Sequence, residues 1–146
     1  MKKALWVAAL VAVGACSSLK PLPIRAGDSC FRCRRTIEDV KRAAEMIDSS
    51  RMALPFRSAG CVAKYLIDHP EETPRAVFVT DYATGKLVSA QSALFVPVML
   101  DDKTGERDYL AFASQQDATA FAHRHDTITV NWRGVMAQAH VSEVSN

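Results

Sequence analysis

The sequence predicts an α+β fold made of two pseudo-repeated ββαβ units that follow an N-terminal leader and a tether. The first observation is a pair of similar segments, FRSAGCV at 56–62 and FASQQDA at 112–118, which align at an offset of 56 residues. The second is the pattern around each segment, strand-like before and after it and helical within it. The third is composition: 146 residues, 49% of them hydrophobic, can bury one core or two very small ones.

Net charge argues against one large class of function. The chain has 18 Lys and Arg against 16 Asp and Glu, and Lys2 and Lys3 belong to the leader. The mature chain is therefore close to neutral, whereas proteins that bind phosphate backbones are usually strongly basic. We expect no nucleic acid partner.

The first unit is predicted at about residues 36–86, and its start is ambiguous. Apolar residues within 36–48 have helical spacing, whereas the repeat requires a strand near 43–48. We follow the repeat, because the order of strands and caps then agrees between the two halves. The remaining predicted elements are a turn at 48–50, a strand at 51–57, a helix capped by Ser58 over 58–69, a strand at 76–80 and a turn at 81–86.

The second unit is predicted at about residues 92–135. Ser114 and Asp117 resemble a capping box, which predicts a helix over 114–125. Pro97 lacks a backbone donor, so its strand is expected at a sheet edge or a bulge. The other predicted elements are a strand at 93–100, a turn at 101–105, a strand at 108–112 and a strand at 127–132.

Residues 1–15 predict a lipoprotein signal peptide. Two lysines precede an apolar run of 11 residues, 4–14, which has the length of a signal-peptide core and is too short to span a bilayer. The run ends in Val-Gly-Ala before Cys16, which resembles the lipobox of bacterial lipoproteins. The alternative is an ordinary secretory signal that is cut before Cys16.

The lipobox predicts where in the cell the protein lies. Cys16 is expected to carry acyl chains and to anchor the protein to a membrane, with residues 16–29 as a lipidated tether. Ser17 follows, rather than Asp, as in lipoproteins sorted to the outer membrane. We therefore expect the protein in the cell envelope, at the outer membrane and facing the periplasm.

Cys30 and Cys33 form a CxxC pair, which can hold one metal ion or close a short disulfide. No second CxxC or histidine pair follows at the spacing of a zinc finger. Arg32, Arg34 and Arg35 flank the pair, and their positive charge is expected to favour the thiolate form. From the residues alone, a metal site and a structural disulfide both stay open.

Cys61, Met99 and two histidines also carry side chains that could bind a metal or react. Cys61 falls in the first turn of the predicted helix, where the dipole can acidify a thiol, although a small buried apolar role is equally open. Met99 lies beside the predicted turn at 101–105, and a lone Met is usually core filling. His69 and His125 fall at helix ends, which explains them without a metal.

Four segments follow the lipobox in order. They are Cys30-x-x-Cys33, the stretch 56–66 with its Gly-Cys, TDYATGK at 80–86 and AFASQQDA at 111–118. Together they resemble the NosL family of membrane-anchored copper chaperones associated with nitrous oxide reductase assembly. The resemblance covers about residues 28–133 and implies a fold of two ββαβ units, in agreement with the repeat. On this basis a NosL-like domain is expected at 30–140.

The resemblance implies Cu(I) binding through Cys30 and Cys33, with a methionine thioether from the second unit. Met99 is the nearest candidate for that thioether, and Cys61 is a further candidate ligand. Thiolates and thioethers are soft ligands that select Cu(I). Family members usually carry Gly-Met after the second cysteine, where this chain has Arg34-Arg35.

We therefore expect a lipoprotein, and not an enzyme, that binds Cu(I) transiently and delivers it to a copper-acceptor protein. The resemblance suggests nitrous oxide reductase maturation as the setting. Two alternatives stay open. One is a NosL-like scaffold lipoprotein without metal, in which Cys30 and Cys33 form a structural disulfide. The other is a thiol–disulfide oxidoreductase built on Cys30, Cys33 and Cys61.

Overall fold

The computed structural model describes residues 19–101 and 106–144, in which three α-helices pack against antiparallel sheets. The predicted α+β class is confirmed. The predicted leader, Cys16 and most of the predicted turn at 101–105 lie outside the described residues. Among the described helices, none has both the length and the apolar character needed to cross a membrane.

The first unit is built on a four-stranded antiparallel sheet. It contains β1 (Ala44–Ile47), β2 (Ala53–Phe56), β3 (Ala76–Thr80) and β4 (Leu87–Ser89), in the order β2-β1-β3-β4. β1 is central and all four of its side chains are buried, which confirms the strand expected near 43–48 over the helical alternative. A short 3-10 helix, η1 (Val40–Arg42), precedes it, and β4 is an element that the sequence analysis missed.

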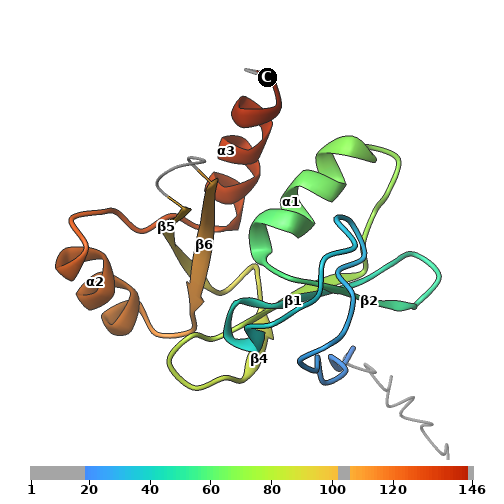
Figure 1. Ribbon diagram of the computed structural model, residues 1–146, viewed down its shortest axis with the longest axis horizontal. Helices are drawn as coiled ribbons and strands as arrows, with labels where there is room; N and C mark the ends of the chain where they lie inside the picture. The colour runs from blue at the N-terminus through green and yellow to red at the C-terminus, as the bar shows by residue number, and fades with distance from the viewer. Residues whose placement is uncertain (1–18, 102–105, 145–146) are drawn as a thin grey trace, which may run out of the picture.

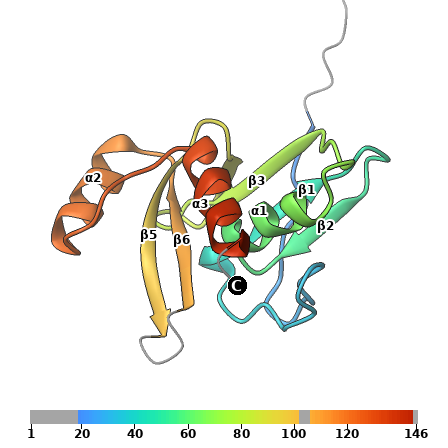
Figure 2. The same cartoon turned by 90° about the horizontal axis from the view of Figure 1, so that it is seen from above.

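Helix α1 (Ala59–Asp68) covers one face of this sheet (Figures 1 and 2). Its start is fixed as predicted, because the Ser58 side chain accepts a hydrogen bond from the Cys61 N–H at 3.1 Å. Val62 and Ala63 are buried against the sheet side of the helix. The predicted helix over 58–69 is thereby confirmed.

The second unit begins with β5 (Leu94–Asp101) and β6 (Glu106–Phe112), which form a two-stranded ladder followed by α2 (Gln115–Arg124). Pro97 stands in β5, which has a full partner strand on one side only, in agreement with its predicted place at an edge. The Ser114 side chain caps α2 by accepting from the Asp117 N–H at 3.3 Å. Figure 2 shows α2 at the end of the molecule away from α1.

The strand predicted at 127–132 is wrong. Only Val130 pairs there, in a single bridge to Phe95, and Trp132 already begins helix α3 (Trp132–Val144). The alternation that favoured a strand includes Ile128, which is 64% exposed and packs against no partner strand. The second unit is therefore ββα followed by one bridge and a helix.

One buried cluster spans both units, and a second lies within the second unit between β5, β6 and α2. Phe56 and Val62 from the first unit belong to the same buried cluster as Phe95, Trp132 and Val135 from the second. α3 packs beside α1, as Figures 1 and 2 both show. The predicted turn at 81–86 also joins the halves, since its Tyr82 N–H donates to the Ala111 carbonyl of β6 at 2.8 Å.

Candidate metal centre

Cys30 and Cys33 lie on a tight loop before η1. The Cys30 N–H donates to the Arg35 carbonyl at 2.9 Å, and the Arg34 N–H donates to the Cys30 carbonyl at 3.0 Å. Arg34 adopts the left-handed conformation that this reversal requires, with φ of 62°. The closed loop holds the two sulfur atoms of the CxxC pair near each other.

The loop is fixed against β2 and α1. The Phe31 N–H donates to the Pro55 carbonyl in β2 at 2.8 Å. The Phe31 ring packs edge-on against Phe56 and Tyr65, with centroids 6.0 and 5.5 Å apart. Both contacts hold the CxxC loop over the beginning of α1.

That position brings Cys61 to the CxxC pair. The sulfur atoms of Cys30, Cys33 and Cys61 all lie within 4.8 Å of one another. Cys30 is fully buried, whereas Cys33 and Cys61 are half-buried. The three described cysteines are free thiols, so the structure contains a cluster of three sulfurs rather than a Cys30–Cys33 disulfide.

The pKa values of Cys30 and Cys61 are shifted in opposite directions. The pKa of Cys30 lies well below its ordinary value, although burial alone would raise it. The largest cause is a hydrogen bond that the Cys61 thiol donates to the Cys30 sulfur. The backbone N–H groups of Cys33 and Arg57 donate further hydrogen bonds that lower the pKa in the same way. The hydrogen bond between Cys61 and Cys30, together with burial, raises the pKa of Cys61. The shared hydrogen bond therefore favours the thiolate form of Cys30 and the protonated form of Cys61.

The sequence led us to expect that Arg32, Arg34 and Arg35 would favour the thiolate form of the CxxC pair. The low pKa of Cys30 has a different cause. None of the three is among the groups that lower the pKa of Cys30. Hydrogen bonds to sulfur, rather than neighbouring positive charge, favour the thiolate. The guanidinium groups make other contacts. That of Arg32 pairs with Asp68 at 3.0 Å, and that of Arg35 lies 3.8 Å from Glu106. The Arg34 guanidinium lies over the Phe31 ring, 5.2 Å from its centroid.

Replacing Cys61 by alanine is expected to raise the pKa of Cys30, because the hydrogen bond that lowers it most is removed. The measurement is a pH titration of thiolate ultraviolet absorbance in the reduced, metal-free protein. Cys33→Ala is the matched control and should shift the onset of absorbance less, since the Cys33 side chain contributes least. An onset that stays at the wild-type pH in Cys61→Ala would contradict the proposed hydrogen bond.

Gly60, next to Cys61, lets α1 approach β6. Its N–H donates to the buried Asp108 carboxylate at 3.2 Å, and the Tyr109 N–H donates to the same oxygen at 2.8 Å. Burial raises the pKa of Asp108 even so. A Cβ at residue 60 would lie 2.7 Å from this oxygen, so only glycine fits without a shift. The contact fixes the first turn of α1, and with it Cys61, against the second unit.

Gly60→Ala is expected to destabilise the protein by about 1–3 kcal/mol, because the new methyl group overlaps Asp108. Thermal unfolding of the wild type and the variant measures this. In an Asp108→Ala background the overlap is absent, and Gly60→Ala should then stabilise by up to about 1 kcal/mol through helix propensity. Equal effects in both backgrounds would show that the overlap is not the cause.

The other candidates from the sequence lie away from the cluster. Cys33 and Cys61 line a hollow on the surface, and Met99 does not belong to its lining. Met99 is 46% exposed on β5. Its role as a copper ligand stays a prediction. His69 stacks on Tyr65 and His125 on Phe121, with ring centroids 4.5 and 4.2 Å apart. Both histidines stand at helix ends, as expected.

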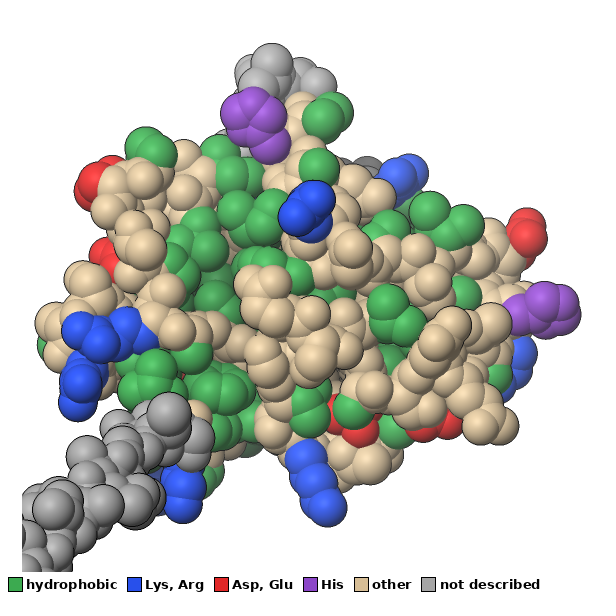
Figure 3. Space-filling view, turned by 180° about the vertical axis from the view of Figure 1, so that it is seen from behind, with side chains coloured by type: hydrophobic (Ala, Val, Ile, Leu, Met, Phe, Trp, Pro, Cys, Tyr) green, Lys and Arg blue, Asp and Glu red, His purple; other side chains and the backbone are tan. Residues whose placement is uncertain are grey.

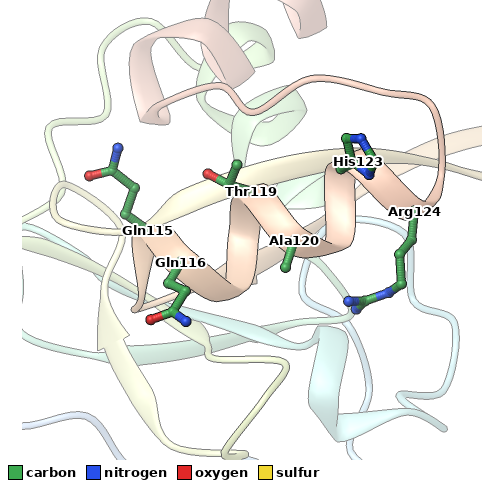
Figure 4. Close-up of a pocket in the computed structure, with 6 residues that line it drawn as sticks. All are labelled: Gln115, Gln116, Thr119, Ala120, His123 and Arg124. Atoms are coloured by element: carbon green, nitrogen blue, oxygen red, sulfur yellow. The ribbon is translucent and has the colours of Figure 1, made fainter.

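A second hollow lies along the outer side of α2 and offers no comparable chemistry. Figure 4 shows that all of its labelled side chains come from this one helix. They include a single imidazole and no thiol or carboxylate. The lining residues are Gln115, Gln116, Thr119, Ala120, His123 and Arg124. Among the described residues, the three cysteines are the one group of three or more His, Cys, Asp or Glu residues able to hold a metal ion together.

Comparison with known proteins gives two findings. The family described as NosL matches residues 21–140 of the chain. Among solved structures, the chain is similar to the crystal structure of the copper chaperone NosL from Shewanella denitrificans, with a TM-score of 0.63 and 20% sequence identity. That match covers 77% of this chain and 92% of the other, and at this identity it supports the fold alone. The search of curated proteins gave no match.

Proposed function

Because the chain belongs to the NosL family, we propose that it is a copper chaperone which binds Cu(I) through Cys30, Cys33 and Cys61 and passes the ion to a partner protein. The observation that carries this proposal is the convergence of three sulfur atoms within 4.8 Å of one another. Three sulfurs around one ion, at a bond length of about 2.3 Å as for zinc and thiolate, lie about 4 Å apart. The cluster needs only small movements to reach that arrangement.

The ligand set favours Cu(I) over Zn(II). Thiolates are soft ligands, and Cu(I) is stable with two or three of them, whereas structural Zn(II) takes four ligands in a tetrahedron. Among the described residues, no fourth His, Cys, Asp or Glu joins the three cysteines. A site with fewer than four protein ligands also leaves the ion open to attack by the ligands of an acceptor.

The arrangement of the thiols suits exchange. Cys30 is buried, and the hydrogen bonds that lower its pKa favour the thiolate form that copper binds. Cys33 and Cys61 face a hollow of about 1080 Å³. Cys61 must lose its proton to bind copper and can regain it when copper leaves. Copper therefore enters and leaves on the side of Cys33 and Cys61.

The cellular setting is part of the same proposal. Acyl chains on Cys16 anchor the protein to the outer membrane on its periplasmic side. The predicted tether at 16–29 is shorter than expected, because the Leu22 N–H donates to the Glu45 carboxylate at 2.9 Å and the Gly27 N–H to the Ile37 carbonyl at 3.0 Å. Few residues therefore separate the anchor from the folded domain, which stays near that surface. The copper acceptor belongs to the maturation of nitrous oxide reductase. The protein acts as a carrier and not as an enzyme.

The proposal is tested by anaerobic titration of the reduced protein with Cu(I) and with Zn(II), each in competition with a chelator of known affinity. One Cu(I) per chain should bind, and far more tightly than Zn(II). Zinc affinity equal to or above that of copper would reject the copper assignment. Cu(I) binding that is unchanged in Cys61→Ser but lost in Met99→Leu would move the third ligand to the thioether.

One observation favours a second candidate, thiol–disulfide exchange: the lowered pKa of Cys30 next to two other thiols. Against it, the Cys30 sulfur has no exposed surface from which to attack a substrate disulfide. A reduction potential far above that of structural disulfides would favour this candidate.

A further inference from the structure

The hollow that Cys33 and Cys61 face is rich in positive charge. Five basic and two acidic side chains line it. The whole chain, by contrast, has only 18 basic and 16 acidic residues, so the excess is local. On the face shown in Figure 3, basic side chains stand mainly near the outline. The basic side chains of the hollow are Arg32, Arg35, Arg57, Lys64 and Arg107, and the acidic ones are Glu106 and Asp108.

The acidic side chains neutralise only part of this charge. Arg32 is paired with Asp68 at 3.0 Å, outside the lining, and Glu106 is shared by Arg35 at 3.8 Å and Arg57 at 3.5 Å. Asp108 is buried, and burial raises its pKa, so it contributes less negative charge than an exposed carboxylate. Lys64 and Arg107 form no ion pair within 4 Å with any other residue that the structure describes. The hollow therefore keeps a net positive charge.

Part of this charge acts on the sulfurs themselves, since Cys61 and Cys33 interact electrostatically with Arg57 and, against the effect of burial, help to raise its pKa. Lys64 and Arg107, by contrast, are not among the groups that shift the pKa of Cys30 or Cys61, so their charge needs another explanation. Any group that takes copper from Cys33 and Cys61 must enter the hollow that they line. Cations around the path by which copper leaves attract negatively charged binding partners and repel positively charged ones.

We propose that the hollow docks an acidic segment of the protein with which copper is exchanged, by pairing its carboxylates with Lys64, Arg107 and the arginines beside them. This inference rests on the proposed copper-chaperone function. A segment of protein chain is favoured over a membrane surface because the cations line a concave hollow that side chains can enter and a flat bilayer cannot. Docking there would place the metal-binding groups of the partner next to Cys33 and Cys61.

The experiment uses two synthetic peptides with the same Met-x-Met copper-binding core, flanked either by glutamates or by glutamines at the same positions. Binding of each labelled peptide to the metal-free protein is measured by fluorescence anisotropy. Transfer of Cu(I) from the loaded protein to each peptide is then followed by stopped flow without oxygen. Metal-free binding tests the docking surface by itself, and a chelator titration without peptide tests whether the protein holds copper.

The glutamate peptide should bind the metal-free protein at least about tenfold more tightly and take copper about tenfold faster, with both ratios falling toward one at high salt. Lys64→Gln with Arg107→Gln should remove most of this preference. The control is Arg25→Gln with Lys86→Gln, which removes the same charge from exposed residues that do not line the hollow. This control should retain the preference for the glutamate peptide.

Equal binding of the two peptides by the wild type, or a preference that survives in Lys64→Gln with Arg107→Gln, would overturn the inference while leaving the copper site untouched. Vesicles rich in phosphatidylglycerol that bind the metal-free wild type and not this variant, with no preference between the peptides, would assign the hollow to a lipid surface instead. Failure to hold Cu(I) against the chelator would reject the proposed function and not the docking result.

Discussion

Replacing both Cys30 and Cys33 by serine is expected to lower the affinity for Cu(I) by more than about 10⁴-fold. Loss of a partner that only supports a metal ligand already costs about 10–100-fold in affinity, and this variant removes two of the three proposed ligands themselves. A hydroxyl is a hard ligand that does not replace a thiolate on Cu(I). The measurement is anaerobic competition against a Cu(I) chelator.

Cys30 is fully buried, so the double variant needs a check of its fold by backbone NMR. Cys33→Ser with Cys61→Ser provides a second route, because both of these side chains are only half-buried. Met99→Leu is the control and should retain wild-type affinity. Wild-type affinity in a folded Cys30→Ser, Cys33→Ser protein would place the copper site elsewhere.

Cys16→Ala is expected to abolish acylation and to leave an unprocessed precursor. The basic start, the apolar run and the small residues before Cys16 form the signal on which this expectation rests. Each acyl chain contributes about 0.8 kcal/mol per buried CH₂, so two or three chains decide whether the processed protein stays on a membrane. Labelling of growing cells with fatty acid, followed by detection of the protein, measures the outcome.

Cys61→Ala is the matched control for this labelling, since it also removes one thiol but lies in the folded domain. It should incorporate fatty acid like the wild type. Label that persists in Cys16→Ala would contradict the anchor and leave an ordinary secretory signal as the explanation of the leader.

Local periodicity and the internal repeat disagreed over residues 36–48, and the repeat was correct. Ala44 and Ile47 have helical spacing, but they belong to β1, which β2 and β3 flank on both sides. A central strand is buried on both faces, so β1, which buries all four of its side chains including Glu45, shows none of the alternation that identifies a half-buried strand. The long-range pairing of β1, which no local window contains, decided the outcome.

The reverse error occurred at residues 127–132. Ile128, Val130 and Trp132 alternate as in a strand, yet only Val130 finds a pairing partner. A signal for α3 was present, because Trp132, Val135 and Ala139 repeat at helical spacing and are buried. Asn131 before them accepts the Gly134 N–H at 3.0 Å in the manner of an N-cap.

The metal cluster could be predicted in part. Cys30 and Cys33 are neighbours in sequence, so their proximity follows from the CxxC spacing. Cys61 was one of two candidates for a third ligand, and the sequence could not decide between it and Met99. The proximity of Cys61 to the CxxC pair depends on tertiary packing, in which Phe31 holds the CxxC loop over the beginning of α1. The cause of the low pKa of Cys30 was missed for the same reason.

X-ray absorption at the copper edge, on the reduced protein loaded with one Cu(I) per chain, counts the sulfur neighbours of the ion. We expect three sulfur neighbours at one distance in the wild type, and two in Cys61→Ala. The spectrum of Met99→Leu should match that of the wild type. A wild-type spectrum with nitrogen or oxygen neighbours, or one with three sulfurs that persists in Cys61→Ala, would contradict a site built from Cys30, Cys33 and Cys61.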